Sequence, residues 1–537
     1  MLIKQTILLI LTSFLLGYGC TSVDKKNNTK FNDALAVQNL DITIPGSFST
    51  QTVLYFDSLL IDSFLLKYKA LGLVKNELKS FYSGRKYAYA WFDGNGLTEQ
   101  AEHLYNRVIH LKKDGIPDTT LYQTALISIF ENDITNEKAP EVDMMLTAQY
   151  FYYSQLIYNG LPESITKSLQ WFLPRKKIAV TKMLDSLLQT PSGNIFKNEP
   201  VYRQYPLLKT QLSFYRQLET SGKDEIIVAD KKQYNTGDSS SVILAIRNKL
   251  EALGDLINNN QSDTFDEALQ AAIKQFQKRH GLNETGIIGT DFLKELNVPI
   301  NDRIRQIILN MERCRWLPEK SEGEYLVVNL PEFRLHAYND DSLLWSMKVV
   351  VGRELRKTVV FNGKITYLVF SPYWNIPPGI LRKDVLPAMR RNKNYLTKNN
   401  MEIVGYSGNT PRIRQRPGKN NALGGVKFIF PNSYTIYLHD TPSKSLFEKE
   451  NRAFSSGCIR VEDAEKLARY LLRHQPDWTD DRINKAMNAG KEEYVNLKQV
   501  MPVFLVYFTS WVDDEGKLNF RKDMYGRDKA LEAIIFK

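Results

Sequence analysis

The spacing of apolar residues changes along the 537-residue chain, and the change predicts more than one kind of structure. From about residue 40 to residue 230, apolar side chains recur every three or four positions, as in 58–68 and 143–158. This period is typical of helices that bury one face. Beyond Glu324 the period falls to two, in short runs rich in β-branched residues, which is typical of strands. The sequence therefore predicts a multidomain α+β protein.

A compact helical unit is predicted between residues 241 and 298. The segments 243–253, 264–280 and 290–296 each place apolar residues on one face. The second segment begins with two acidic residues, which stabilise a helix N-terminus. His280 at its end has no nearby Cys or His to complete a zinc site, so we expect a surface or capping residue.

Short strand patterns separated by turn-length gaps follow this unit. They lie at 325–330, 333–338, 343–351, 364–370, 426–432 and 501–509. Several strands at this spacing predict a β-sandwich. A helix is predicted at 464–473, between the last two strands.

Residues 434–463 carry a clear chemical signal. Alternation from Thr435 to His439 predicts a strand that the following Thr-Pro ends, and a second extended segment begins at Ile459. The chain therefore doubles back and brings His439 near Cys458. A thiol attacks carbonyl carbon only as the thiolate, and an imidazole within hydrogen-bonding reach is the usual base that produces one. We predict Cys458 as a nucleophile and His439 as its base.

The residues beside the predicted nucleophile have expected roles of their own. Gly457 allows the backbone to turn, so the N–H groups of Gly457 and Cys458 are the expected oxyanion donors. Arg460 shares the nucleophile's side of the sheet, where it would either bind a substrate carboxylate or form a structural salt bridge. Ser455 and Ser456 are expected to donate hydrogen bonds around the site.

Three more side chains are considered for this site. Trp374 and Tyr437 would either line it or only pack nearby. Asp440 follows His439 directly, and alternation sends its carboxylate to the opposite face of the strand. We therefore do not expect the Asp440 side chain to orient the imidazole.

The segment at about 373–425 interrupts the strands just before this site. It is too long for a hairpin turn and contains a predicted basic helix at 380–400. A charge run is usually a solvated face. Because this one lies beside the predicted nucleophile, we interpret the segment as an insert that caps the substrate.

Two strings around the predicted pair resemble a known signature. His-Asp-Thr-Pro from His439 and Ser-Ser-Gly-Cys-Ile-Arg-Val from Ser455 resemble the motif of L,D-transpeptidases of the YkuD type. In that family the His and the Cys sit on adjoining strands of a β-sandwich, and a backbone carbonyl orients the imidazole. Tyr-Ala-Trp-Phe around Trp91, Leu-Thr at Thr147 and the segment 310–318 resemble the large multidomain Gram-negative members. In those members the insert is a mobile lid.

The helical unit at 241–298 has a resemblance of its own. It is similar to peptidoglycan-binding modules, whose hallmark is matched by Ala272, Phe276, Gln277, Gly281 and Leu282. Phe276 and Leu282 are expected in the core of the module. Whether such a module grips glycan or only serves as a spacer stays open.

These resemblances imply acyl transfer on peptidoglycan tetrapeptide stems, which act as donor and acceptor. A Cys458 thioester would yield a 3-3 cross-link, with no cofactor and no metal, and carbapenems would acylate the same thiol. The same site could instead act as an L,D-carboxypeptidase, exchange D-amino acids or anchor a protein to peptidoglycan. A fourth alternative is a wall-binding lipoprotein without catalysis. A papain-like protease is disfavoured, because no papain-like string surrounds Cys458.

The N-terminus predicts export. Lys4, an apolar run at 7–16 and a terminal Cys20 have the layout of a secretory signal that is too short to span a membrane. Cys20 resembles the lipid-attachment residue of bacterial lipoproteins, which implies a periplasmic, membrane-anchored protein. The alternatives are ordinary signal cleavage and an uncleaved anchor.

Composition adds few constraints. The net charge of +11 is spread along the chain, and no basic and aromatic motif indicates nucleic-acid binding. With Cys20 and Cys458 assigned, Cys314 has no partner, so it is expected to be buried and inert and no disulfide framework is expected. The predicted organisation is signal peptide 1–20, tether 21–39, helical scaffold 40–233, peptidoglycan-binding-like module 241–298, linker helix 299–322, catalytic domain 323–510 with its insert at about 373–425, and C-terminal segment 511–537.

Overall fold

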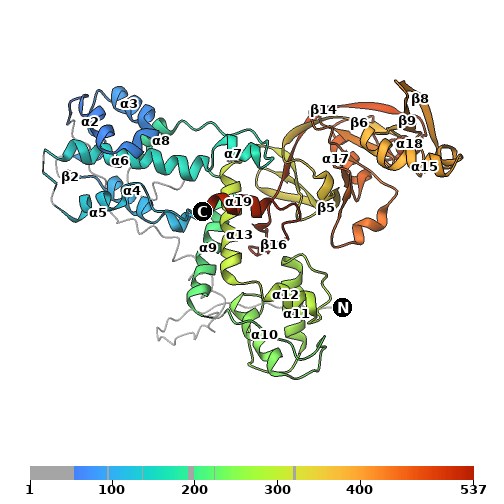
Figure 1. Ribbon diagram of the computed structural model, residues 1–537, viewed down its shortest axis with the longest axis horizontal. Helices are drawn as coiled ribbons and strands as arrows, with labels where there is room; N and C mark the ends of the chain where they lie inside the picture. Colours follow the sequence, from blue (N-terminus) through green and yellow to red (C-terminus); the bar gives the residue numbers. More distant parts are fainter. Residues whose placement is uncertain are drawn as a thin grey trace, which may run out of the picture. The chain divides into compact units, whose positions relative to one another are not determined.

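A computed structural model describes residues 54–93, 96–132, 134–135, 137–190, 199–222, 224–318 and 322–537 (Figure 1). The predicted signal peptide, tether and lipid-attachment residue Cys20 lie outside the described residues. Within the described ranges, no helix has the length and apolarity that crossing a membrane requires. The predicted α+β organisation is confirmed, with helices in the N-terminal and middle regions and a large sheet toward the C-terminus.

The N-terminal region is helical, as its apolar period predicts. Its helices are α2 (Leu60–Lys67), α3 (Lys75–Gly84), α4 (Glu99–Ile109), α5 (Gln123–Glu131), α6 (Ala139–Ser154), α7 (Glu163–Ser168), α8 (Val180–Gln189) and α9 (Gln204–Thr220), with a short hairpin of β1 (Phe92–Asp93) and β2 (Gly96–Leu97). Figure 1 shows α6 between the α2/α3 pair and α4. Because α6 is covered from several sides, nearly all of its side chains are buried.

A buried polar network joins α6 to the string around Trp91. The Asp143 carboxylate accepts hydrogen bonds from the Trp91 N–H at 2.7 Å and from the Tyr82 hydroxyl at 2.6 Å. Thr147, one turn along α6, accepts from the Trp91 indole at 2.8 Å. Burial raises the pKa of Asp143 to about 6 despite these donors. The strings around Trp91 and Thr147, which both resemble large transpeptidases, are thus in direct contact in the structure.

The middle region contains the three predicted helices, α10 (Ser241–Ala252), α11 (Glu267–Arg279) and α12 (Thr290–Leu296). Asp266 precedes α11 as its N-cap and accepts from the Leu269 N–H at 2.8 Å. Phe276 is buried in the core of this unit, as predicted. Leu282 is not in that core but half-buried at the wall of a cavity.

His280 corrects one expectation. Its ring caps α11, with Nδ1 2.8 Å from the Phe276 carbonyl oxygen, but it is buried and not at the surface. It stacks on Phe276 and on Phe520, whose position 240 residues away along the chain no local pattern reveals. Burial lowers the pKa of His280 well below its ordinary value.

The predicted linker helix is α13 (Ile300–Arg315), and it is buried along most of its length. Arg315 pairs with Glu312 at 2.5 Å, and Arg313 pairs at 2.6 Å with Asp528 of the C-terminal helix α19 (Arg527–Ile535). The Glu312 carboxylate also accepts from the Trp316 indole at 2.7 Å. Cys314 on this helix is fully buried, as predicted.

The C-terminal region is built on one nine-stranded sheet. Its strands are β3 (Glu324–Asn329), β4 (Arg334–Asn339), β5 (Ser342–Gly352), β6 (Asn362–Phe370), β10 (Val426–Ile429), β11 (Leu438–His439), β12 (Ala453–Ser455), β13 (Ile459–Val461) and β14 (Glu493–Val506), in the order β12-β5-β13-β11-β10-β6-β14-β3-β4. An additional β4–β5 pairing closes the sheet on itself, so the predicted strands form the two facing layers of a flattened, closed sheet. The inward-facing residues are fully buried, among them Leu326, Val328, Leu438, Ile459 and Leu505.

Smaller elements complete this region. The predicted helix at 464–473 is α17 (Ala464–Leu472), followed by α18 (Asp480–Asn488). A C-terminal hairpin of β15 (Ser510–Val512) and β16 (Leu518–Phe520) precedes α19. The hairpin contacts α9, α11 and α13, and α19 packs on α13, so these elements connect the sheet to the helical regions.

The insert has its own structure. It contains β7 (Trp374–Asn375), α14 (Pro378–Ile380), a π-helical turn (Leu381–Val385), α15 (Leu386–Arg391), α16 (Tyr395–Lys398), β8 (Met401–Ser407) and β9 (Thr410–Gln415). The basic helix predicted at 380–400 is therefore broken into short pieces, and the β8–β9 hairpin was not predicted. Ile376, Leu381, Val385 and Ile413 form a small separate core.

Asp143→Ala is expected to lower the thermal midpoint of the N-terminal region, with a loss of roughly 2–4 kcal/mol of stability. The buried Trp91 N–H and Tyr82 hydroxyl would lose their acceptor. Asp62→Ala, which removes an exposed ion pair to Lys79, is the matched control and should change little. Differential scanning calorimetry of both variants measures the effect, and equal shifts would contradict it.

Candidate active site

Strand pairing puts the two predicted catalytic residues on neighbouring strands, where they are diagonal neighbours in the register. β11 and β13 are parallel neighbours, with Leu438 opposite Ile459 and His439 opposite Arg460. The Ile459 N–H donates to the Tyr437 carbonyl at 3.1 Å. Opposed residues in a sheet point to the same side, so Leu438 and Ile459 both enter the core.

The opposite side of these strands carries the chemistry. Side chains alternate, so Tyr437 and His439 share the outward face of one strand, and Cys458 and Arg460 share it on the next. The strand around His439 is shorter than predicted, because Thr435 has a left-handed backbone with φ of 55°. The chain therefore returns through a loop into a parallel neighbour instead of a simple hairpin.

The Cys458 thiol is half-buried beside this face. Its Sγ lies 3.6 Å from the Thr435 carbonyl oxygen, to which the S–H can donate. Burial raises the pKa of Cys458 above its ordinary value, although hydrogen bonding from Tyr437 and the charge of Arg460 oppose the rise. At neutral pH the resting thiol is protonated.

The His439 imidazole is buried and held in one orientation. Its Nδ1 lies 2.5 Å from the backbone carbonyl oxygen of Asp440. A carbonyl can only accept, so Nδ1 carries the proton and Nε2 is left with a lone pair. Burial, and then the positive charge of Arg460, lower the pKa of His439 to about 4. The imidazole is therefore neutral at pH 7 and can accept a proton.

The Asp440 side chain does not touch the imidazole. Its carboxylate accepts from the Gly425 N–H at 2.9 Å and from Lys444 at 2.8 Å. A Cβ at Gly424, where φ is 60°, would lie 2.2 Å from this carboxylate. Asp440 thus fixes the end of the insert against the strand that carries His439.

The loop before the nucleophile is held by Ser455. Its hydroxyl accepts from the Gly457 N–H at 3.1 Å and donates to the Cys458 carbonyl at 2.5 Å. Gly457 has φ of 122°, a conformation that side-chain-bearing residues rarely adopt. Of the two predicted oxyanion donors, the Gly457 N–H is engaged, while the Cys458 N–H meets no acceptor among the described residues.

Two residues that the sequence gave no reason to select support this loop. The buried Thr358 hydroxyl donates to the Gly457 carbonyl at 2.8 Å and accepts from the Gly352 N–H at 2.9 Å. The Tyr525 hydroxyl donates to the Gly352 carbonyl. Neither residue was predicted as a site residue, and both are far from Cys458 along the chain.

The remaining predicted residues are placed differently. Arg460 has a buried Nε with no partner, and no carboxylate among the described residues forms an ion pair with it. The structure therefore shows no salt bridge of Arg460 among the described residues, and its role toward a substrate stays a prediction. Ser456 is exposed and accepts from Arg356 at 2.7 Å. Trp374 packs in the core of the insert, and Tyr437 lies against the thiol and 5.7 Å from the His439 ring.

Within the part of the chain that the structure describes, no group of three or more His, Cys, Asp or Glu side chains is arranged to hold a metal ion. The arrangement is that of a protonated thiol and a neutral imidazole, next to an unpaired guanidinium. Such a site can transfer an acyl group through the sulfur.

Family models match three parts of the chain. Residues 323–485 match the "L,D-transpeptidase catalytic domain" of the YkuD family. Residues 76–212 match a "Scaffold domain", and residues 239–296 match a "Putative peptidoglycan binding domain".

Known proteins give further similarities. A "Putative L,D-transpeptidase" of Haemophilus influenzae is 35% identical over 243 residues, which cover 42% of this chain and 49% of that protein. The chain thus matches about half the length of this relative. An L,D-transpeptidase structure from Xylanimonas cellulosilytica has 15% identity, covers 52% of this chain and 100% of that one, and has a TM-score of 0.18. One from Stackebrandtia nassauensis has 14% identity, coverage of 52% and 97%, and a TM-score of 0.21.

The rate at which iodoacetamide alkylates Cys458 is expected to rise with pH. The midpoint of this rise should lie at a higher pH than for an ordinary thiol. Only the thiolate reacts, and burial raises the pKa of Cys458. Peptide mass spectrometry across a pH series measures the midpoint, and the fully buried Cys314 is an internal control that should stay unmodified. A midpoint below neutrality would instead indicate a preformed thiolate and imidazolium pair.

Proposed function

We propose that this chain, which has a YkuD L,D-transpeptidase catalytic domain and a peptidoglycan-binding domain, forms 3-3 cross-links between peptidoglycan stem peptides through a thioester on Cys458. One observation carries the proposal. The matched domain places Cys458 and a neutral, oriented His439 on the same face of adjacent strands. This supports acyl transfer by a cysteine.

The first half-reaction forms the acyl-enzyme. His439 Nε2 takes the thiol proton as the sulfur attacks the carbonyl of the meso-diaminopimelate residue in a tetrapeptide donor. The C–N bond to the terminal D-Ala breaks, and the imidazolium returns the proton to the leaving amine. Because both groups are neutral at rest, proton transfer accompanies the attack.

The second half-reaction resolves the thioester. The side-chain amine of a second stem attacks the thioester carbonyl, and His439 removes a proton from this amine. The C–S bond then breaks, and the leaving Cys458 thiolate takes the proton from the imidazolium. The new amide is the 3-3 cross-link. The thioester retains the energy of the broken peptide bond, so the reaction needs no nucleotide and no cofactor.

The charge that develops on the carbonyl oxygen needs a donor. The Cys458 N–H is the candidate in the resting structure, and such a donor is worth about 3 kcal/mol in the transition state. The Gly457 N–H would join it only if the Ser455 hydroxyl released it.

Arg460 is the candidate for substrate orientation. Among the described residues, its half-buried guanidinium has no acidic partner, and it lies two residues from the nucleophile on the same face. Such a group is suited to a substrate carboxylate. The insert, fixed by Asp440, is the candidate lid over the bound stem.

A peptidoglycan substrate implies a location outside the cytoplasm. We propose export by the segment 1–20 and lipid attachment at Cys20, with a periplasmic, membrane-anchored protein as the result. Metabolic labelling with a radioactive fatty acid tests this, because Cys20→Ala should abolish the label.

Purified protein added to tetrapeptide-rich sacculi is expected to produce 3-3 dimers, and Cys458→Ala should produce none. Separation of muropeptides by liquid chromatography and mass spectrometry provides the measurement. Tripeptides alone would indicate carboxypeptidase activity, and exchanged termini would indicate D-amino-acid exchange. No change with wild-type protein would support a non-catalytic wall-binding protein.

A separate control measures whether the Cys458 thiol can be acylated, and it needs no acceptor stem peptide. Intact-protein mass spectrometry with a carbapenem should show one adduct on the wild-type protein and none on Cys458→Ala. An acylated enzyme that makes no cross-link would point to a missing acceptor, such as a protein to be anchored.

Arg460→Gln is expected to raise KM for a tetrapeptide donor about tenfold, because one charge-assisted contact to a carboxylate is lost. Steady-state release of D-Ala measures KM and kcat. Arg469→Gln, on the outer side of α17 and paired with Glu465, is the matched control. An unchanged KM would remove Arg460 from substrate binding.

A further inference from the structure

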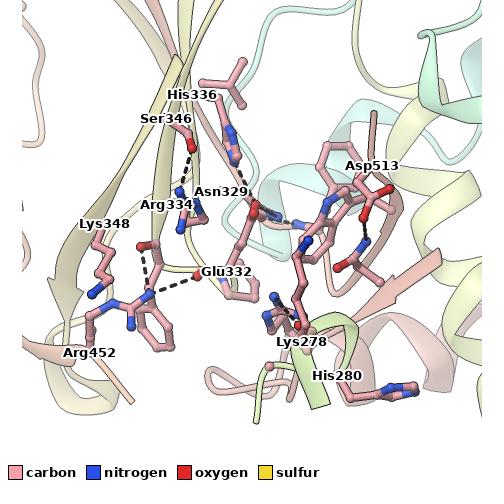
Figure 2. Close-up of a pocket in the computed structure, with 18 of the residues that line it drawn as sticks. Lys278, His280, Asn329, Glu332, Arg334, His336, Ser346, Lys348, Arg452 and Asp513 are labelled. Atoms are coloured by element: carbon pink, nitrogen blue, oxygen red, sulfur yellow. Dashed lines mark hydrogen bonds and ion pairs between the residues drawn. The ribbon is translucent and has the colours of Figure 1, made fainter. Parts of the chain in front are cut away.

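A second candidate site lies in a cavity that His439 and Cys458 do not line. The cavity has a volume of about 1010 Å³. Its walls come from the α11 end of the peptidoglycan-binding domain, from β3, β4 and β5, from the loop 447–452 and from the C-terminal hairpin (Figure 2). It is therefore open to a ligand that also touches the peptidoglycan-binding domain.

Three guanidinium groups line this cavity without an acidic partner. Arg334 donates to the Ser346 hydroxyl at 2.6 Å. Arg452 donates to the Phe333 carbonyl at 3.2 Å, and Arg521 donates to the Arg279 carbonyl at 2.9 Å. All of these acceptors are neutral. Among the described residues, no carboxylate is within ion-pair distance of the three arginines.

The acidic groups that line the cavity form no ion pair with these three arginines among the described residues. The Glu332 carboxylate accepts from His336 at 3.0 Å and from Asn329 at 3.2 Å, as Figure 2 shows. His336, and then the charges of Arg521 and Arg334, lower the pKa of Glu332 despite its burial. At the rim, Lys348 pairs with Glu448 at 3.6 Å, and Lys278 pairs with Glu515 at 3.3 Å.

The buried carboxylate of Glu332 therefore offsets only part of the positive charge of the three arginines, and it forms no ion pair with any of them. Burial, followed by the repulsion of Arg334 and Arg521, lowers the pKa of Arg452 to about 10. The buried Nε of Arg452 also has no hydrogen-bond partner. Cations that lie close together in a cavity without ion pairs repel one another, which destabilises the protein when no ligand is bound. Binding of a carboxylate or phosphate offsets this repulsion.

The cavity and the thiol open on one face of the sheet. On β4 and β5, Arg334 is paired with Lys348. On β5 and β13, Val350 is paired with Arg460. Lys348 and Val350 are two residues apart on β5, so all four side chains lie on the same face. With a rise of ~3.3 Å per residue and ~4.8 Å between strands, the Cα atoms of Lys348 and Cys458 are about 14 Å apart. Four extended peptide residues span about the same distance.

We propose that Arg334, Arg452 and Arg521 form a second peptidoglycan-binding site, which takes a carboxylate of a stem peptide and is separate from the Cys458 thiol. The identity of this ligand rests on the proposed function, whereas the unpaired cations do not. The site would hold a strand by its anionic groups while a stem reaches the nucleophile. Free phosphate shares the same oxyanion chemistry and is the competing source.

Binding is measured with full-length Cys458→Ala protein, which cannot be acylated, and a purified disaccharide-tetrapeptide. In isothermal titration calorimetry, adding Arg452→Gln or Arg334→Gln should weaken binding about tenfold each. Arg469→Gln is the matched control and should bind as the parent does. A disaccharide-tetrapeptide with amidated carboxylates should bind as weakly as the arginine variants, and inorganic phosphate should not displace the native ligand at equal concentration.

Unchanged affinity in both arginine variants would overturn the proposal, and so would phosphate that binds more tightly than the disaccharide-tetrapeptide. A second measurement does not depend on the folding of variants. A photoreactive disaccharide-tetrapeptide should label peptides from 327–348 and 447–452, and labelling only elsewhere would also refute the site. A carbapenem adduct on the wild-type thiol separates this failure from failure of the catalytic proposal.

Discussion

The parallel pairing of β11 with β13 is the constraint on which the site depends. One backbone hydrogen bond, from the Ile459 N–H to the Tyr437 carbonyl, fixes which residues face each other. A shift of one residue would turn His439 into the core and Leu438 outward, since side chains alternate. The burial of Leu438 and Ile459 opposes such a shift. The hydrophobic core therefore sets the register, and the register sets the chemistry.

Burial also determines the protonation state of the pair. It raises the pKa of Cys458 and lowers the pKa of His439, so both groups are neutral in the resting protein. The nearby charge of Arg460 cannot stabilise an imidazolium, but it favours an anion. Arg460 therefore acts on both members of the pair: it lowers the pKa of Cys458, which favours the thiolate, and it lowers the pKa of His439, which keeps the imidazole neutral. The Asp440 backbone carbonyl fixes the imidazole, which leaves the Asp440 carboxylate available to hold the insert.

Local patterns made much of this structure predictable. Alternation located the strands from Tyr325 to Phe370, and the strings at His439 and Ser455 indicated the catalytic pair. Sequence reasoning could not supply contacts between distant segments. Thr358 supports the nucleophile loop, His280 is buried against Phe520, and Arg334, Arg452 and Arg521 meet at one cavity, all through tertiary packing. The β8–β9 hairpin was missed because its strands are mostly exposed, so no apolar alternation marks them.

The helix α13 has a consequence for how separable the parts of this chain are. Its charged side chains are satisfied by groups from other regions: Arg313 by Asp528 after the sheet, and Glu312 by the Leu161 N–H before it. If the sheet region were expressed alone, the charged side chains of α13 would lose their partners. They would then be either buried without a partner or exposed together with the apolar surface around them. The chain therefore contains several domains that match separate family models, but the stability of each domain depends on contacts with the others. Recombination with another architecture would have to transplant α13 and its counterions together.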